Sequence, residues 1–214
     1  MIQKLLQWAD ENNIPNIVWV KHDSYLQGGY FKGLPRDEEK LHTLQELNLL
    51  GAQITELPEE IALLENLQKL YLMGNQLTTL PQSISTLTQL QELYIPGNSL
   101  VSLPNDIGSL SNLKMLLLQE NKLDTLPASI GQLTNLHTLE LGRNRLYELP
   151  EEVGNLKSLK KLTLWKNKLT TLPKEIEALS ELTELDLTYN KLQLDQNHVK
   201  WLDKLLQNNC MLNI

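Results

Sequence analysis

The hydrophobic positions of the chain recur with a period of 23 residues. Seven leucines mark this period with no insertion or deletion, at Leu44, Leu67, Leu90, Leu113, Leu136, Leu159 and Leu182. The shared pattern is L-x-x-L-x-L-x-x-N-x-L-x-x-L-P-x-x-I-x-x-L-x-x. Within it, L-x-L alternates apolar with outward-facing residues, as at Leu116 and Leu118, which predicts a short strand with one buried face. The Leu-Pro step disfavours helical backbone at the leucine, so a short helical turn or extended chain should follow it.

An asparagine stands where the chain leaves each strand. A side-chain amide at this place can satisfy inward-facing backbone groups of neighbouring turns, so replacing a buried one by alanine should cost about 1–3 kcal/mol. The column consists of Asn75, Asn98, Asn121, Asn144, Asn167 and Asn190. Gly29 and Ala52 occupy the two preceding positions, so the ladder should begin at Asn75.

This pattern resembles the leucine-rich repeat family over residues 44–194. Its L-P-x-x-I form is similar to that of Ras-group, Roco-type and bacterial intracellular leucine-rich repeat proteins. The resemblance implies an α/β solenoid, a horseshoe with a parallel β-sheet on its concave face and short helical or extended turns on its convex face. It also implies a module that binds proteins, generally through the concave strands, and has no catalytic activity.

The stack of repeats needs capped ends, because no repeat buries its leucines alone. We expect an N-terminal cap over residues 1–43, made of a helix, a strand at residues 17–20 and a degenerate repeat over residues 21–43. Seven repeats should follow over residues 44–194. Residues 195–214 should form a helical C-terminal cap. Its buried face is expected to carry Val199, Leu202, Leu205 and Leu206, with Trp201 nearby.

Two columns of outward strand positions form the predicted concave surface. One runs Tyr25, Asn48, Tyr71, Tyr94, Leu117, Glu140, Thr163 and Asp186, and the other Gln27, Leu50, Met73, Pro96, Gln119, Gly142, Trp165 and Thr188. They predict a contiguous apolar patch of Leu50, Tyr71, Met73, Tyr94, Pro96, Met115 and Leu117. A contiguous patch of this kind is typical of a binding surface, although cross-strand pairs also stabilise a sheet without any partner. As an exposed position, Thr163 should tolerate alanine at little cost.

A second, charged and aromatic zone is predicted in the C-terminal half, comprising Glu140, Arg143, Trp165 and Lys166. The next column changes from Gly28, Gly51, Gly74 and Gly97 to Glu120, Arg143, Lys166 and Tyr189. The glycines either make room for a partner or supply a permissive backbone at the strand end. A basic rim adds Lys122, Arg145, Lys168 and Lys191. It either binds an acidic or phosphorylated segment or is simply a solvated edge.

Composition narrows the classes of function. The 214 residues carry a net charge of −7, which argues against general nucleic-acid binding. The single cysteine, Cys210, excludes an intrachain disulfide and favours a reducing compartment. The first residues do not resemble a secretory signal, and no stretch approaches the length of a membrane span. We therefore expect a cytoplasmic location, with unconventional export left open.

Residues capable of catalysis are scattered. His22, His42, His137 and His198 show no metal-ligand spacing, and Gln27-Gly28-Gly29-Tyr30 lacks the features of a phosphate loop. We expect no catalytic site, metal or cofactor. The sequence thus predicts a monomeric module that binds a protein partner. The alternatives are a homo-oligomerising structural protein and a secreted bacterial effector that recognises a host protein.

Overall fold

The computed structural model describes residues 1–20 and 30–214. The sequence predictions for Tyr25, Leu26, Gln27, Gly28 and Gly29 fall outside the described residues. The chain begins with α1 (Ile2–Glu11), β1 (Val18–Val20), β2 (Tyr30–Lys32) and α2 (Glu38–His42). Strands β3 to β9 then span Glu46–Asn48, Lys69–Tyr71, Glu92–Tyr94, Met115–Leu117, Thr138–Glu140, Lys161–Thr163 and Glu184–Asp186. The chain ends with α3 (Gln196–Gln207) and β10 (Met211–Asn213).

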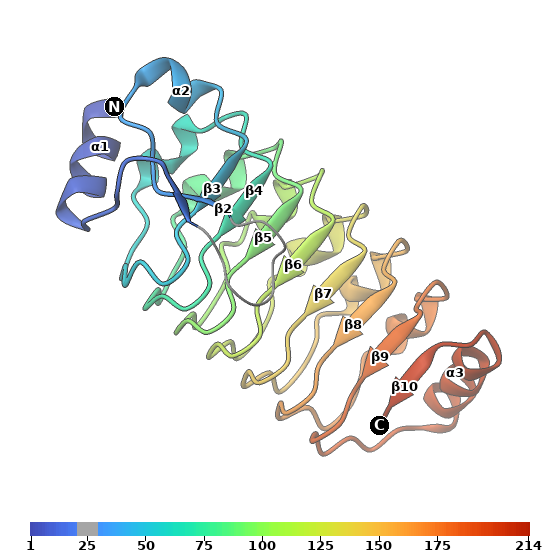
Figure 1. Ribbon diagram of the computed structural model, residues 1–214. Helices are drawn as coiled ribbons and strands as arrows, with labels where there is room; N and C mark the ends of the chain where they lie inside the picture. The colour runs from blue at the N-terminus through green and yellow to red at the C-terminus, as the bar shows by residue number, and fades with distance from the viewer. Residues whose placement is uncertain (21–29) are drawn as a thin grey trace.

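The predicted solenoid is confirmed by one sheet of eight parallel strands, ordered from β3 to β10 (Figure 1). From β3 to β9 each residue pairs with the residue 23 positions later, so that Leu93 pairs with Leu116 and Leu116 with Leu139. Figure 1 shows the sheet as a curved row, with the short helices on its other side. The strands are three residues long, but backbone hydrogen bonds between neighbouring repeats continue beyond them, as from the Leu72 N–H to the Tyr94 carbonyl and from the Gly74 N–H to the Pro96 carbonyl.

Short 3₁₀ helices follow the Leu-Pro steps, as the sequence pattern predicts. They are η1 to η6, spanning Glu59–Leu63, Gln82–Thr86, Ile107–Ser109, Ala128–Gln132, Glu151–Asn155 and Lys174–Ala178. Pro127 has an extended backbone, with φ −70° and ψ 148°, and the buried Ile130 of η4 points into the core. A Cβ atom on Gly131 would lie 2.4 Å from the carbonyl oxygen of Glu152. Glycine therefore permits the close approach of η4 and η5.

The asparagine ladder connects neighbouring repeats as predicted. Asn121 Oδ1 accepts a hydrogen bond from the N–H of Leu100 at 3.0 Å. Its Nδ2 donates to the carbonyls of Ile95 at 2.9 Å and Leu118 at 3.1 Å. The other five asparagines of the column make the equivalent three bonds. Each repeat thereby satisfies backbone groups that the preceding turn leaves inside the core.

The N-terminal elements do not continue the parallel pattern in the described residues. β1 and β2 pair with each other antiparallel, and Gly33 then forms an antiparallel bridge with Asn48 of β3. The expected strand near residues 17–20 is thus present, whereas residues 30–32 of the expected degenerate repeat form a hairpin strand. The helix α1 packs against η1 through Leu5, Trp8 and Ala9, which are buried.

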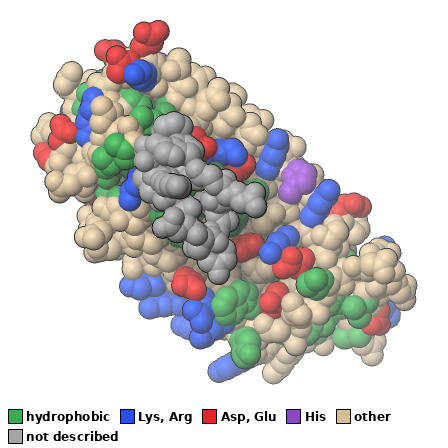
Figure 2. All heavy atoms as spheres, in the orientation of Figure 1, with side chains coloured by type: hydrophobic (Ala, Val, Ile, Leu, Met, Phe, Trp, Pro, Cys, Tyr) green, Lys and Arg blue, Asp and Glu red, His purple; other side chains and the backbone are tan. Residues whose placement is uncertain are grey.

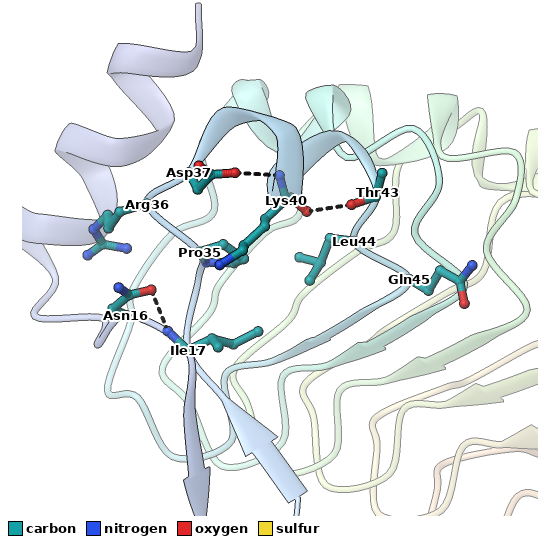
Figure 3. A pocket seen from close by; sticks show the side chains of 9 residues that line it. All are labelled: Asn16, Ile17, Pro35, Arg36, Asp37, Lys40, Thr43, Leu44 and Gln45. Atoms are coloured by element: carbon teal, nitrogen blue, oxygen red, sulfur yellow. Dashed lines mark hydrogen bonds between the residues drawn. The ribbon is translucent and has the colours of Figure 1, made fainter.

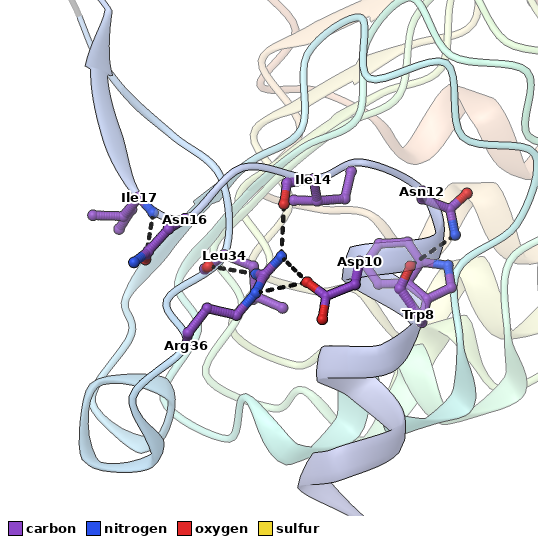
Figure 4. Close-up of polar contacts among 8 residues, drawn as sticks. All are labelled: Trp8, Asp10, Asn12, Ile14, Asn16, Ile17, Leu34 and Arg36. Carbon is purple, nitrogen blue, oxygen red and sulfur yellow. Dashed lines mark hydrogen bonds and ion pairs between the residues drawn. The ribbon is translucent and has the colours of Figure 1, made fainter.

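Arg36 joins the N-terminal segments (Figure 4). Its guanidinium donates to Asp10 Oδ1 of α1 at 2.7 Å, to the carbonyl of Ile14 at 2.7 Å and to the carbonyl of Leu34 at 2.8 Å. These bonds attach α1 to the segment that enters the first repeat.

The C-terminal helix is present but presents a different face from the one expected. His198, Trp201, Leu202 and Leu205 are buried, whereas Val199 and Leu206 are 47% and 53% exposed. The expectation that Val199 and Leu206 face inward is therefore wrong. It was based on hydrophobicity alone, and both sets of residues have a spacing that fits one face of a helix. The strand β10, which the sequence did not indicate, then pairs with β9. Burial of Cys210 beside it raises the pKa of that thiol, which lowers its reactivity.

Candidate binding surface on the concave face

The first predicted zone contains a stacked pair of tyrosines. The rings of Tyr71 and Tyr94 lie 4.7 Å apart between centroids, with an angle of 19° between their planes. The Tyr94 hydroxyl donates to Glu92 Oε2 at 2.8 Å, and it lies 3.6 Å from Met115 Sδ. Burial raises the pKa of both tyrosines, and the carboxylate of Glu92 adds to the effect. The pair therefore stabilises the sheet, while both side chains remain partly exposed on its surface.

The other residues of the apolar patch lie on the same face. Leu117 follows Tyr94 in the cross-strand register, and Met115 pairs with Glu92. Leu50, Pro96, Met115 and Leu117 are half-buried, and Met73 is 43% exposed. The structure thus brings the predicted patch together. Whether a partner uses it stays a prediction.

Charged side chains on the concave face next to this patch form ion pairs with one another. Lys161 Nζ lies 3.1 Å from a carboxylate oxygen of Glu140 and 3.1 Å from one of Glu184. Burial lowers the pKa of Lys161, but its hydrogen bonds to both carboxylates outweigh burial and raise the pKa overall. The Gln119 amide also donates to Glu140. Glu140 is therefore engaged within the sheet.

Trp165 dominates the second predicted zone. Its indole covers the backbone of Gly142, because a Cβ atom there would lie 2.1 Å from Trp165 Nε1. The Arg143 guanidinium lies 5.1 Å from the indole ring centroid and donates to Glu120 Oε1 at 3.0 Å. Lys166 is exposed beside this group. Glycine at position 142 is what allows the indole to lie across a neighbouring repeat.

A shallow pocket joins the two zones. Its volume is about 380 Å³, and it is lined by Met73, Gly74, Pro96, Gly97, Gln119, Glu120, Glu140 and Trp165. The sequence columns placed Met73, Pro96 and Trp165 on one face but left them in separate zones. They missed Gln119 and Glu120 as lining residues, since only the position of the indole reveals that these residues border a common hollow.

Comparison with known protein families identifies the family to which this chain belongs. A model of the leucine-rich repeat region matches residues 95–213, and a leucine rich repeat model matches residues 42–100. The chain belongs to the leucine-rich repeat family. Leucine-rich repeat domains generally mediate protein–protein interaction, and their fold is typically non-catalytic.

Solved leucine-rich repeat structures are similar to this chain. The Leptospira interrogans protein LIC12759 is 39% identical with a TM-score of 0.64, over 78% of this chain and 48% of that one. The ectodomain of the Arabidopsis thaliana receptor kinase GASSHO1/SCHENGEN3, in complex with CASPARIAN STRIP INTEGRITY FACTOR 2, is 31% identical with a TM-score of 0.67, over 72% and 20%.

The leucine-rich repeat domain of the type III effector XCV3220 (XopL) is 26% identical with a TM-score of 0.61, over 85% of this chain and 72% of that domain. In the comparison with the Leptospira protein, this chain spans about half the length of that protein's structure. A comparison with curated proteins found no match.

The column of glycines has a backbone explanation that applies to the whole repeat array. Gly51, Gly74 and Gly97 have φ between 58° and 68°, and Glu120, Arg143, Lys166 and Tyr189 have φ between 55° and 57°. Every described position of this column is thus left-handed. Glycine adopts this conformation without strain, which supports the permissive-backbone interpretation. Gly74 and Gly97 also line the pocket, so backbone without side chains forms part of the pocket surface.

Thr163 does not have the exposure expected of it. Although it lies on the concave face between Glu140 and Asp186 in the register, it is only 5% exposed. Its hydroxyl has no hydrogen-bond partner within the part of the chain that the structure describes. The expectation that Thr163 is a freely exposed position is therefore wrong, because neighbouring repeats shield it.

The basic rim is exposed as predicted. Lys122, Arg145, Lys168 and Lys191 all have exposed side chains, and Figure 2 shows Lys and Arg side chains gathered along the lower edge of this view. The surrounding water screens their repulsion. The proposed acidic or phosphorylated ligand for this rim stays a prediction.

Another pocket lies at the N-terminal end (Figure 3). It has a volume of about 470 Å³ and is lined by residues that include Ile17, Arg36 and Lys40. The guanidinium of Arg36 is already bound to Asp10 and to two backbone carbonyls. We therefore assign this charged group to the anchoring of α1. In the described ranges, no helix combines the length and apolar character needed to cross a bilayer.

Proposed function

We propose that this leucine-rich repeat chain is a non-catalytic module that binds a segment of a partner protein on its concave face. The observation that carries the proposal is the shared pocket, in which Met73 and Pro96 of one predicted zone face Trp165 of the other. Large apolar and aromatic side chains in a hollow are the usual anchors of protein interfaces. The eleven predicted residues then act as the centre and border of one surface.

The charge distribution favours an apolar anchor on the partner. Both carboxylates that line the pocket have cationic neighbours, since Glu120 pairs with Arg143 and Glu140 with Lys161. A charged group entering the pocket would compete with these pairs and lose its hydration. An apolar side chain meets Met73, Pro96 and the indole without that cost. The structure of the receptor kinase ectodomain in its complex provides a precedent for ligand binding within the family.

Site-specific photocrosslinking tests the proposal directly. A photoreactive amino acid at position 73, on the concave face, should crosslink a protein partner in a cytoplasmic extract. The matched control carries the same group at position 101, because Val101 is 47% exposed, close to the 43% of Met73, but lies on a connecting segment outside the sheet. A crosslink from position 73 alone supports concave-face binding.

Affinity measurements with the captured partner then test the anchors. Trp165→Ala and Met73→Ala should each weaken binding at least tenfold, which corresponds to about 1.4 kcal/mol. Tyr147→Ala provides an aromatic control, since Tyr147 is 51% exposed outside the strands. Equal effects of all three variants would contradict the proposed pocket. A crosslink to a second copy of the chain would instead favour the homo-oligomeric alternative.

A further inference from the structure

A cluster of possible metal ligands lies where the C-terminal helix meets the last 3₁₀ helix. Glu177 belongs to η6, Asp195 caps the N-terminus of α3, and His198 lies in the first turn of α3. The ligand atoms of these three side chains all lie within 4.8 Å of one another. Spacing in the sequence does not reveal this cluster, because Glu177 comes from another element that only the fold brings next to Asp195 and His198.

His198 points to a ligand because its burial is not matched by hydrogen bonding. The residue is only 4% exposed, and within residues 1–20 and 30–214 neither ring nitrogen makes a hydrogen bond of acceptable geometry. Asp195 Oδ1 lies 2.9 Å from Nδ1, which is within ion-pair distance but without the alignment of a good hydrogen bond. A buried imidazole with poorly satisfied nitrogens is unfavourable, and a metal ion would stabilise the nitrogen that carries the lone pair.

Neighbouring groups show the same deficit. In the part of the chain that the structure describes, Oε1 of Glu177 is also buried without a hydrogen-bond partner. The same holds for Nε1 of Trp201, although this indole N–H is a donor and not a metal ligand. Among the described residues eight buried side-chain atoms lack a partner, and these two atoms together with the two nitrogens of His198 make up half of them. The deficit is therefore concentrated at this junction rather than spread over the molecule.

We propose that Glu177, Asp195 and His198 form a zinc site that ties α3 to η6. Zinc binds imidazole nitrogen and carboxylate oxygen at about 2.0–2.2 Å, so these three side chains can supply three of its four ligands, with water as the fourth. The two carboxylates also balance the charge of the ion. Asp195 Oδ1 accepts the helix-capping hydrogen bonds from Asn197 and His198, which leaves Oδ2 for the metal.

The surroundings allow such an ion to reach the cluster and to link α3 to η6. A pocket of about 250 Å³ beside the cluster is lined by Glu177, Trp201, Lys200 and Lys204 among others. Both lysines are exposed, so water screens their charge from the cluster. In a tetrahedral zinc site the ligand atoms are about 3.4 Å apart, a separation that small side-chain rotations can reach. Bound zinc would hold the cap helix against the last repeat.

Zinc titration of the untagged, metal-free chain tests this proposal. Isothermal titration calorimetry should show one zinc ion per chain, and the melting temperature should rise with zinc. Glu177→Gln and Asp195→Asn should each weaken binding at least tenfold, and the asparagine retains the capping ability of position 195. His42→Gln is the matched control, because His42 is exposed on α2 at the other end of the molecule. It should bind zinc like the wild type.

Imidazole resonances provide a readout that does not depend on stability. Zinc should shift the ring ¹⁵N signals of His198 and leave those of His42 unchanged. The absence of saturable binding in the wild type would overturn the proposal. Equal affinity in the wild type and in both carboxylate variants, or a shift confined to other histidines, would overturn it as well. This experiment does not involve the concave face, so its outcome is independent of the proposed function.

Discussion

Replacing Asn121 by alanine should destabilise the repeat array, because one buried backbone N–H group loses its hydrogen-bond acceptor. The N–H of Leu100 is buried, and it donates to Asn121 Oδ1. Alanine offers no acceptor at this place, and an unpaired buried N–H costs about 1–3 kcal/mol. The carbonyls of Ile95 and Leu118 are affected less, because Asn98 and Asn144 continue to donate to them.

Adding these contributions gives the expected size of the effect. If each weakened carbonyl contributes about 0.5 kcal/mol, the total loss in the free energy of unfolding is about 2–4 kcal/mol. Asn135→Ala is the matched control in the same repeat. Asn135 is exposed and its Nδ2 donates a single bond to the carbonyl of Ser111 at 2.8 Å, so this variant should lose less than about 1 kcal/mol.

Urea unfolding followed by circular dichroism measures both variants. The midpoint should fall in Asn121→Ala with the slope unchanged, since the surface exposed on unfolding stays the same. Hydrogen exchange adds a local test, because the Leu100 amide should lose protection in Asn121→Ala and keep it in Asn135→Ala. Equal stability of the two variants, or an equally protected Leu100 amide, would refute the ladder as the source of stability.

Two further predictions concern the core and the acid response. Leu116 is fully buried whereas Leu117 is half-exposed, so urea unfolding should show a loss of about 2–5 kcal/mol for Leu116→Ala and clearly less for Leu117→Ala; the reverse order would contradict the strand register. Hydrogen bonding by the Ser83 side chain, and then by its backbone N–H, lowers the pKa of Glu59. Because the folded pKa lies below the unfolded one, this contribution to stability is complete above the unfolded pKa and is lost as the pH falls through the folded pKa. Ser83→Ala should raise the Glu59 pKa in a carboxyl NMR titration, and an unchanged value would contradict the assignment.

The candidate surface was only partly predictable from the sequence. The columns placed Met73, Pro96 and Trp165 on one face, and all three line the same pocket, although each lies two residues beyond the end of its strand. They did not indicate that the indole of Trp165 covers Gly142 and borders the same hollow as Met73. The direction of these side chains across five repeats depends on which neighbours leave space, and no single repeat contains that information.

The ends of the molecule show the same distinction. The pattern predicted a helix after residue 195, but Val199 and Leu206 proved exposed and His198 buried. The orientation of a cap helix depends on the surface it covers, and two adjacent stripes of α3 fit the helical period equally well. The strand β10 and the antiparallel pairing of β1 with β2 were decided by the same end contacts.

By itself the sequence determined the repeat, its register, the buried leucines and the asparagine ladder. It was sufficient because each repeat contacts mainly its neighbours, so a constant spacing along the chain becomes a constant spacing in space. Only the tertiary structure decided the face of α3, the position of Trp165 and the meeting of Glu177 with His198. These features depend on contacts that occur once, between elements with no common period, and their energies are settled only when the surfaces pack together.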